Sequence, residues 1–212
     1  MIEIQRFTFN PFQENTYLLY DESNDCMVFD PGNSSTDEDN EISSFIKENG
    51  LKLIGVYNTH CHVDHVLGND FFFKEYGLRP RIHEDDLKVL QSVSQYGAMF
   101  GIQVRESPDP ESYINEGDTI PLGKSSLEVL HIPGHAPGHV VFLNKDQKFI
   151  IGGDILFHGS IGRTDLPYGD HETLISSIKD KLMTLDERYI VYPGHGPSTS
   201  IGFEKKSNPF LQ

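Results

Sequence analysis

The sequence has 212 residues, of which 37% are hydrophobic and 23% charged, a balance typical of a globular domain and not of a disordered or fibrous chain. Its formal net charge of −15 argues against nucleic-acid binding, which requires a positive surface to neutralise phosphates. No apolar stretch is long enough to cross a bilayer, and the N-terminal residues lack the basic and apolar regions of an export signal, so we expect a cytoplasmic protein.

The first half of the chain alternates strand and helix patterns. Strands are predicted at residues 2–9, 15–20, 26–30, 51–57 and 81–83, and helices at 37–48, 70–76 and 84–100. In the last of these helices, Val89, Leu90, Val93 and Tyr96 form an apolar stripe, which we interpret as core. Tyr96 and Phe100 lie near its end and could instead line a pocket.

The second half consists mainly of strands. They are predicted at residues 119–122, 126–132, 140–143, 149–151 and, as the last strand, 189–192, with one helix at 171–183. No repeat, low-complexity tract or linker divides the chain, so residues 1–212 are expected to form a single domain. Strands at both ends with helices between them predict a sandwich of sheets covered by helices.

Residues 59–65, with the sequence THCHVDH, join a predicted strand to a predicted helix and are rich in metal ligands. Side chains two apart in an extended segment point to the same side, so His60 and His62 can converge on one point. Asp64 and His65 come where the chain turns and can reach a second point. Imidazoles and carboxylates suit zinc, iron and manganese, and this spacing indicates two metals rather than a chance cluster.

Three further predicted strands end in loops that offer a metal ligand. His135 follows Pro133-Gly134, Asp154 follows Gly152-Gly153, and His195 follows Pro193-Gly194. A single histidine after Pro-Gly is most often an ordinary loop residue. Loops at one edge of a sheet can converge in space, however, and four such loops together predict a shared site.

Other polar residues receive supporting or structural interpretations. Cys61 lies between two convergent histidines and is expected to point away from them, as a small buried residue rather than a ligand or nucleophile. His139 is interpreted as a residue that supports a ligand, and Asp30 as a turn former or a supporting carboxylate. The remaining histidines are expected to be structural or on the surface: His83, His131, His158 and His171.

The motifs at residues 59–65, 133–139, 153–154 and 193–199 resemble those of the metallo-β-lactamase fold superfamily, most closely the glyoxalase II-like (hydroxyacylglutathione hydrolase-like) enzymes. Residues 159–165 resemble the short bacterial branch of that group. The similarity covers nearly the whole chain. It implies an α/β fold, a four-layer αββα sandwich in one domain, with the site at one edge of the two sheets.

The resemblance also implies a ligand set for two divalent metals, with zinc expected and iron or manganese as alternatives. It places His60, His62 and His135 on one metal, Asp64, His65 and His195 on the other, and Asp154 between them. It therefore implies a hydrolase that uses a hydroxide bound by two metals, in which Asp64 and Asp154 are candidate catalytic residues. Two metals also polarise a carbonyl and stabilise its oxyanion.

The substrate is expected to be a small-molecule thioester, because a thiolate of pKa about 8.5 leaves without a strong general acid. Only residues 198–212 follow the last motif, so we expect no C-terminal helical domain of the kind that helps glyoxalase II bind glutathione. The basic residues that would hold glutathione do not align. Arg163 could pair with a substrate carboxylate or with Asp165, and we expect neither a nucleic-acid nor a membrane partner.

Other functions fit part of the pattern. A persulfide dioxygenase with one iron on His60, His135 and Asp154 shares the stretch 162–165, and a lactonase would use the same ligands as the thioesterase. A β-lactamase is disfavoured without an export signal. A non-enzymatic scaffold is disfavoured because structural zinc sites are saturated with four ligands and favour cysteine. The physiological substrate, the native metal and the oligomeric state stay open.

Overall fold

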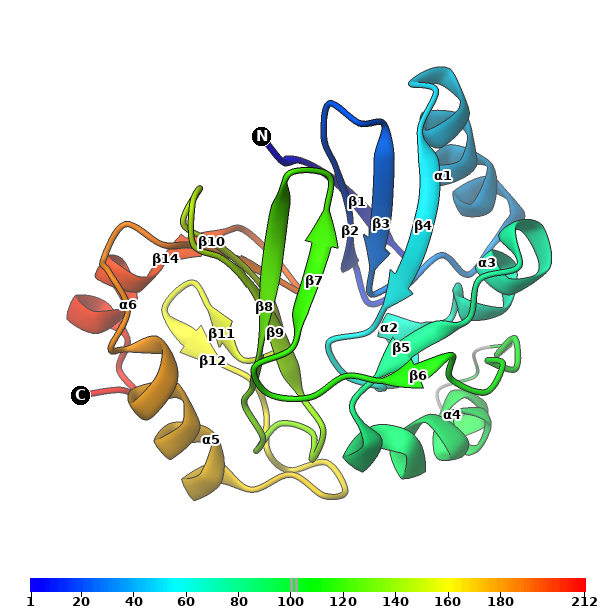
Figure 1. Cartoon of the computed structure of the whole chain (residues 1–212). Helices are drawn as coiled ribbons and strands as arrows, with labels where there is room; N and C mark the ends of the chain where they lie inside the picture. The colour runs from blue at the N-terminus through cyan, green and yellow to red at the C-terminus, as the bar shows by residue number, and fades with distance from the viewer. Residues whose placement is uncertain (100, 102) are drawn as a thin grey trace.

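The structure is a computed structural model that describes residues 1–99, 101 and 103–212, and it contains two six-stranded sheets packed face to face (Figure 1). The first sheet has its strands in chain order: β1 (Glu3–Phe9), β2 (Glu14–Tyr20), β3 (Asp25–Phe29), β4 (Lys52–Tyr57), β5 (Pro80–Ile82) and β6 (Ser112–Tyr113). Its first three strands are antiparallel, and β3 to β6 are parallel.

The second sheet has the order β14-β13-β10-β9-β8-β7. Its strands are β7 (Thr119–Leu122), β8 (Ser125–His131), β9 (Val140–Asn144), β10 (Phe149–Gly153), β13 (Ile190–Pro193) and β14 (Thr199–Ser200). Only β10 and β13 pair in parallel; the other neighbours are antiparallel. A small separate ribbon pairs β11 (Leu156–Phe157) with β12 (Ser160–Ile161).

Helices cover the outer faces of the two sheets (Figure 1). On the side of the first sheet lie α1 (Thr36–Glu48), α2 (Val63–Val66), α3 (Asn69–Tyr76) and α4 (Leu87–Met99). On the side of the second sheet lie α5 (His171–Ser177), extended by a π-helical turn (Ile178–Leu182), and α6 (Ile201–Ser207). This arrangement confirms the expected αββα sandwich.

Successive side chains of a strand point to opposite faces of its sheet, so each sheet packs against the other sheet on one face and against helices on the other. In β2, Tyr17 and Leu19 point into the core between the sheets, whereas Leu18 points outward to the core beneath α1 and α3. In β10, Ile151 faces the other sheet and Ile150 faces α5. The central strands β9 and β10 are therefore buried on both faces and almost continuously apolar, whereas β1 and β7 at the sheet edges alternate between buried and exposed residues.

Several element boundaries differ from the predictions. The predicted helix 84–100 begins with a separate 3₁₀ turn (Glu84–Asp86), and Phe100 lies outside the described residues. Residues 189–192 were wrongly predicted to be the last strand, because β14 pairs with β13 afterwards and α6 follows. Strands as short as β6, β11, β12 and β14 have only two residues, too few for an alternating pattern.

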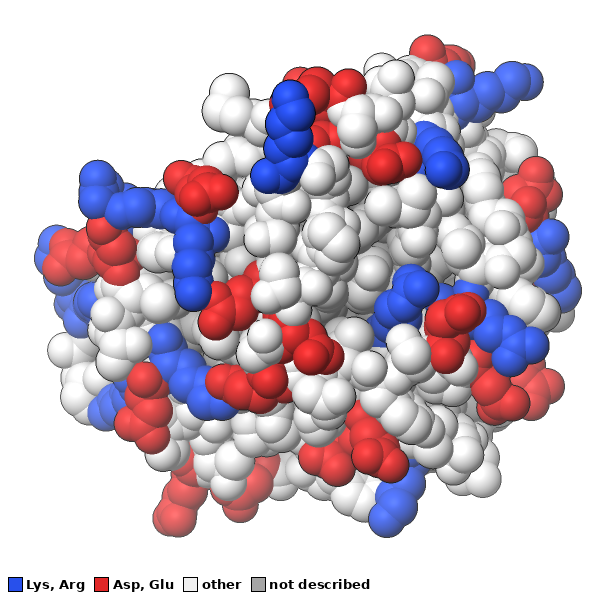
Figure 2. Space-filling model, in the orientation of Figure 1, with Lys and Arg blue, Asp and Glu red and all other residues white. Residues whose placement is uncertain are grey.

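The charged side chains on one face of the molecule are of both signs. On the face in Figure 2, lysine and arginine side chains lie beside aspartate and glutamate side chains, and several of these neighbours form ion pairs. Among the described residues, no helix is both long and apolar enough to cross a bilayer.

Candidate metal centre

The first group of donors forms where β4 leaves the sheet. His60 and His62 lie in the loop between β4 and α2, and His135 lies in the loop between β8 and β9. His62 Nδ1 is 2.9 Å from His135 Nε2, which is 3.2 Å from His60 Nε2. The structure thus brings together the three residues that the resemblance assigns to one metal.

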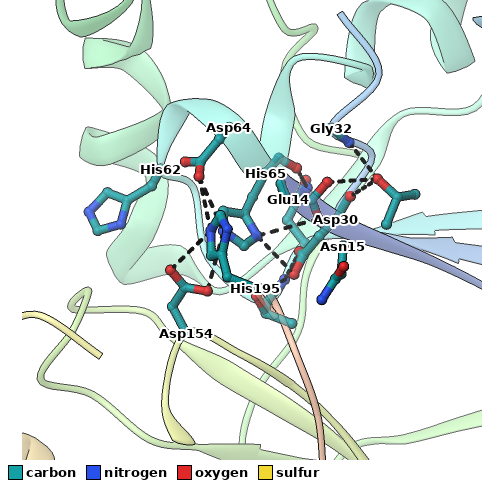
Figure 3. Close-up of polar contacts among 12 residues, drawn as sticks. Glu14, Asn15, Asp30, Gly32, His62, Asp64, His65, Asp154 and His195 are labelled. Carbon is teal, nitrogen blue, oxygen red and sulfur yellow. Dashed lines mark hydrogen bonds and ion pairs between the residues drawn. The ribbon is translucent and has the colours of Figure 1, made fainter. Parts of the chain in front are cut away.

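Figure 3 shows the second group together with His62 of the first group. Asp64 and His65 are on the single turn of α2, and His195 follows β13. His195 Nε2 is 3.1 Å from Asp64 Oδ2, and His65 Nε2 is 3.8 Å from the same oxygen. The donor atoms of this group all lie within 4.8 Å of one another, as do those of the first group.

Asp154 follows β10, and Figure 3 shows its side chain beside His65 and His195. Its Oδ1 is 3.5 Å from His65 Nε2. Its Oδ2 is 3.7 Å from His135 Nε2 and 3.6 Å from His195 Nε2. One carboxylate therefore faces histidines of both groups, which is the position needed to bridge two cations.

The carboxylates and imidazoles of the centre change each other's pKa values. Burial alone would raise the pKa of Asp154, but the neighbouring His65 outweighs it and holds that pKa well below its usual value. Burial likewise opposes the charge on His65, but Asp154 and Asp64 raise the pKa of that imidazole well above its usual value. In the metal-free protein, the carboxylates are thus ionised and take a proton on His65 as their counter-charge.

Hydrogen bonds behind the rings fix which nitrogen faces the centre. His135 Nδ1 lies 2.7 Å from the carbonyl oxygen of Arg163, which can only accept, so Nδ1 donates and Nε2 presents its lone pair. His60 Nδ1 lies 3.0 Å from Thr59 Oγ1, whose proton is donated to Asp30. The lone pairs of His60 and His135 therefore face each other, an arrangement that fits a cation between them.

Buried polar atoms without a hydrogen-bond partner also fit a bound cation at this centre. Both ring nitrogens of His65 and the Oδ1 atom of Asp154 are buried, and within the described part of the chain none of them has a hydrogen-bond partner. Buried polar atoms are almost always hydrogen-bonded, and a metal ion would satisfy His65 Nε2 and Asp154 Oδ1. The donor set of five histidines and two carboxylates, without thiolate, suits zinc, iron or manganese.

Two carboxylates support His65 from behind. Asp30, which follows β3 with φ of 49°, accepts from the Thr59 amide at 2.6 Å and places Oδ2 3.2 Å from His65 Nδ1. Glu14 lies behind them, 3.8 Å from the same nitrogen, and burial raises its pKa well above the usual value. The supporting interpretation of Asp30 agrees with these contacts, whereas the sequence analysis did not identify Glu14.

The N-terminal hairpin holds the loop that carries His195. Asn15 donates from its amide to the carbonyl of Gly194 at 2.7 Å and from its side chain to that of Pro193 at 3.0 Å. The buried Tyr17 hydroxyl donates to the same Pro193 carbonyl at 2.7 Å. His195 Nδ1 in turn faces the carbonyl of Phe12 at 3.2 Å, which orients Nε2 toward Asp64.

The centre also depends on two tightly packed neighbours of Asp154. His139 stacks on His60 and accepts from the Asp154 amide at 3.0 Å, in agreement with a supporting role. Gly194 leaves no room for a side chain, because a Cβ there would lie 2.3 Å from Asp154 Oδ1 and 2.6 Å from His65. A glycine at this position lets the loop approach the carboxylate.

Asp86 ties together the two loops that supply the first donor group. Its Oδ2 accepts from the Cys61 amide at 2.6 Å, and its Oδ1 accepts from the Gly138 amide at 2.7 Å. It is fully buried, and burial raises its pKa to about 6 against the opposing effect of these hydrogen bonds. Neither this residue nor its role was identified from the sequence, since a single Asp in an acidic stretch carries no distinctive pattern.

The surroundings of Cys61 and Arg163 indicate what these two residues do. Burial raises the pKa of the Cys61 thiol well above its usual value, and the residue packs in an apolar cluster rather than among the donors. This environment disfavours a thiolate nucleophile.

The guanidinium of Arg163 forms two hydrogen bonds of 2.8 Å with Asp165. The backbone carbonyl of Arg163 orients His135.

The other four histidines lie apart from the donor groups. His83 stacks on His131, and both approach Asp85, whose side chain is exposed. His171 begins α5 at the surface. His158 stacks on Phe203 and lines the same cavity as the donors, a position that the sequence analysis did not predict.

Comparison with known proteins identifies the family. Residues 9–195 match the metallo-beta-lactamase superfamily. The chain belongs to this superfamily. It is 39% identical over 210 residues to the "Probable metallo-hydrolase YqgX" of Bacillus subtilis, covering 98% of this chain and 96% of that protein. It is also 39% identical over 202 residues to the "Hydroxyacylglutathione hydrolase GloC" of Haemophilus influenzae, covering 94% and 93%.

Solved structures of the superfamily superpose closely on the chain. The protein TTHA1623, in a di-iron-bound form, has a TM-score of 0.89 and 34% identity, with 98% of this chain and 100% of that one covered. The B3 metallo-beta-lactamase BLEG-1 has a TM-score of 0.89 and 31% identity, with 99% of both chains covered. The chain is therefore a metallo-hydrolase by family, with the fold that the sequence predicted.

Replacing Gly194 with Ala is expected to reduce metal binding. The new Cβ would displace Asp154 or His65, because neither atom it meets can stay in place. Metal content per chain, measured by mass spectrometry after purification, should fall well below that of the wild type. Gly117→Ala is the matched control, since it adds backbone strain at a φ of 84° far from the donors. Equal metal content in Gly194→Ala and wild type would contradict the close packing.

Replacing Asp86 with Ala is expected to lower the free energy of unfolding by about 2–6 kcal/mol, because two buried amides lose their acceptor at about 1–3 kcal/mol each. Urea unfolding of the metal-free protein measures this change. The neighbouring Asp85→Ala, whose side chain is 60% exposed, should stay within about 0.5 kcal/mol of wild type. A loss no larger than that of the control would show that Asp86 does not tie the loops.

The metal-free protein is expected to lose stability as the pH falls from 6.5 to 5.5. Burial lowers the pKa of four histidines, so they stay neutral when folded but take up protons when unfolded, with ordinary pKa values near 6.5. These residues are His60, His62 (to about 3), His135 and His139. Each contributes up to about 1.4 kcal/mol per pH unit.

Other buried groups change this balance only in part. His65 and His195 have raised pKa values, so they stay protonated when folded while the unfolded imidazoles titrate; each opposes the trend by about half a proton at pH 6.5 and by almost none at pH 5.5. Glu14 and Asp86 have raised pKa values and also oppose the trend. Together these four groups weaken the effect of the four neutral histidines without reversing it. The urea midpoint should therefore fall between pH 6.5 and 5.5, and a rising midpoint would contradict these protonation states.

Proposed function

We propose that the protein hydrolyses thioesters with two divalent metal ions held by His60, His62 and His135 on one side and by Asp64, His65 and His195 on the other, with Asp154 between them. The observation that carries this proposal is the position of Asp154, whose two oxygens face histidines of both groups. When bound, such a metal pair lowers the pKa of water toward about 7 and polarises a carbonyl group.

The chain's own residues supply position and charge. Asp64 and Asp154 both line the cavity, and the neighbouring His65 lowers the pKa of each against the opposing effect of burial. Their carboxylates are therefore ionised at neutral pH, where they can neutralise cations and orient an attacking water. The carbonyl oxygens behind His135 and His195 keep each Nε2 directed at the centre, which fixes the geometry before a substrate arrives.

A thioester suits this site because, among the described lining residues, no carboxylic acid outside the donor set is available to protonate a leaving group. Among the described residues that line the cavity, Asp64 and Asp154 are the only carboxylic acids, and both belong to the donor set. A thiolate is a good leaving group without protonation, unlike an alkoxide or an amine. The 39% identity to GloC of Haemophilus influenzae, which is named as a hydroxyacylglutathione hydrolase, supports the same reaction class.

A persulfide dioxygenase with one iron is the alternative that the sequence left open. It would use His60, His135 and Asp154, all of which the structure brings together. The chain, however, keeps the second donor group of Asp64, His65 and His195 intact within 4.8 Å. An enzyme with one metal has no need of these buried donors, so the hydrolase with two metals is favoured.

Replacing Asp154 with Asn is expected to lower thioester hydrolysis by about 100-fold or more and to reduce the bound metal, because the amide keeps the shape but removes the charge. The measurements are kcat/KM on a simple acetyl thioester and metal content per chain. Glu41→Ala, an exposed carboxylate on α1, is the control and should match the wild type. Unchanged turnover in Asp154→Asn would refute the bridging role.

The wild-type protein distinguishes the candidate reactions. Two metals per chain with turnover of thioesters support the proposal. One iron per chain with oxygen consumption on a persulfide favours the dioxygenase, and turnover of lactones without thioesters favours a lactonase. S-lactoylglutathione should be hydrolysed with a high KM, because Arg163, the only lysine or arginine among the described cavity residues, is already paired with Asp165.

A further inference from the structure

The donors occupy only one end of a larger cavity. Its volume is about 960 Å³, at the upper end of the usual range for small-molecule sites. Beyond the donors it extends between α4 and the loop 163–169. One wall is formed by Val89, Val93 and Tyr96, which are four and three residues apart and so share a face of α4.

The opposite wall is also apolar. It is formed by Phe157, Ile161, Leu166, Pro167 and Tyr168. Tyr168 is 61% exposed and has a φ of 71°, a backbone conformation that is costly for a residue with a side chain. An exposed aromatic ring held in a strained conformation at the mouth of a cavity is typical of a binding surface.

The carboxylates among the described lining residues, Asp64 and Asp154, both lie at the donor end of the cavity. Among its described lining residues the only lysine or arginine is Arg163, whose guanidinium is already paired with Asp165 through two hydrogen bonds of 2.8 Å. Both side chains are exposed to solvent. Glutathione carries two carboxylates, and burying a carboxylate without a partner is costly. The walls therefore match a hydrocarbon and not a charged tripeptide.

We propose that this apolar cavity binds the acyl group of the substrate, and that the substrate class is thioesters with a medium-chain alkyl or aryl acyl group on an uncharged thiol. The inference rests on the proposed thioester hydrolysis and adds the chemistry of the group beside the scissile bond. The acyl chain lies between the α4 face and residues 166–168, with its carbonyl at the donor end. Each buried methylene raises kcat/KM by about fourfold.

The test uses metal-loaded protein and S-acyl thioesters of N-acetylcysteamine, a neutral thiol. From acetyl to hexanoyl, kcat/KM should rise on the order of 100-fold, following four added methylenes. Phenylacetyl should resemble hexanoyl, and S-lactoylglutathione should fall below both. A flat or falling dependence on chain length, or a preference for S-lactoylglutathione over hexanoyl, would overturn the inference.

A pair of variants on α4 separates the cavity from the general fold. Tyr96→Ser should reduce the hexanoyl-to-acetyl ratio of kcat/KM by about tenfold, because part of the apolar wall is lost. Gln95→Ser changes an exposed side chain that does not line the cavity and should preserve the ratio. An unchanged ratio in Tyr96→Ser would show that the acyl chain does not contact this wall.

Binding of thioether analogues distinguishes failure of the cavity from failure of the reaction. Calorimetry compares S-hexyl with S-methyl N-acetylcysteamine, neither of which can be hydrolysed. Tighter binding of the hexyl compound without turnover of any thioester would refute the proposed reaction but support an apolar ligand. Turnover of acetyl thioesters together with equal binding of the two thioethers would refute only the acyl cavity.

Discussion

At the metal centre, carboxylates and imidazoles lie close together in a largely buried space, and their opposite charges compensate each other. Asp64 and Asp154 are brought within 4 Å of several imidazoles, where carboxylates left alone would be strongly disfavoured. In the metal-free chain a proton on His65 balances them, and in the loaded chain the cations would do so. His65 can therefore carry either a proton or a metal, and the two compete for its Nε2 atom.

The scaffold around this centre uses buried carboxylates that have no place in a metal's coordination shell. Glu14 and Asp30 stand behind His65, and Asp86 joins the loops of His60 and His135 through backbone amides. Part of the chain's acidity is therefore internal. The surface is therefore less acidic than the net charge of −15 suggests. Seven acidic side chains are buried: Glu14, Asp21, Asp30, Asp39, Asp86, Asp154 and Glu204.

The sequence predicted those features that depend on local pattern. Ligand spacing in residues 59–65 and Pro-Gly or Gly-Gly turns after apolar runs were enough to select the residues that the structure gathers at one edge. Residues whose role depends on distant partners could not be selected. Glu14 and Asp86 reach their partners across the fold. The α4 stripe packs in an apolar cluster, as predicted, but Val89 and Val93 also line the cavity. Helical periodicity alone cannot distinguish these two environments.

The hydrogen bonds of Asn15 and Tyr17 to the loop before His195 couple the beginning of the chain to its end, 176 or more residues away. The second donor group is completed only when these two segments meet. During synthesis, a nascent chain that still lacks β13 can display His60, His62 and Asp64 but cannot enclose a pair of ions. A chain that ends before β13 can therefore complete only the first donor group, because it lacks His195.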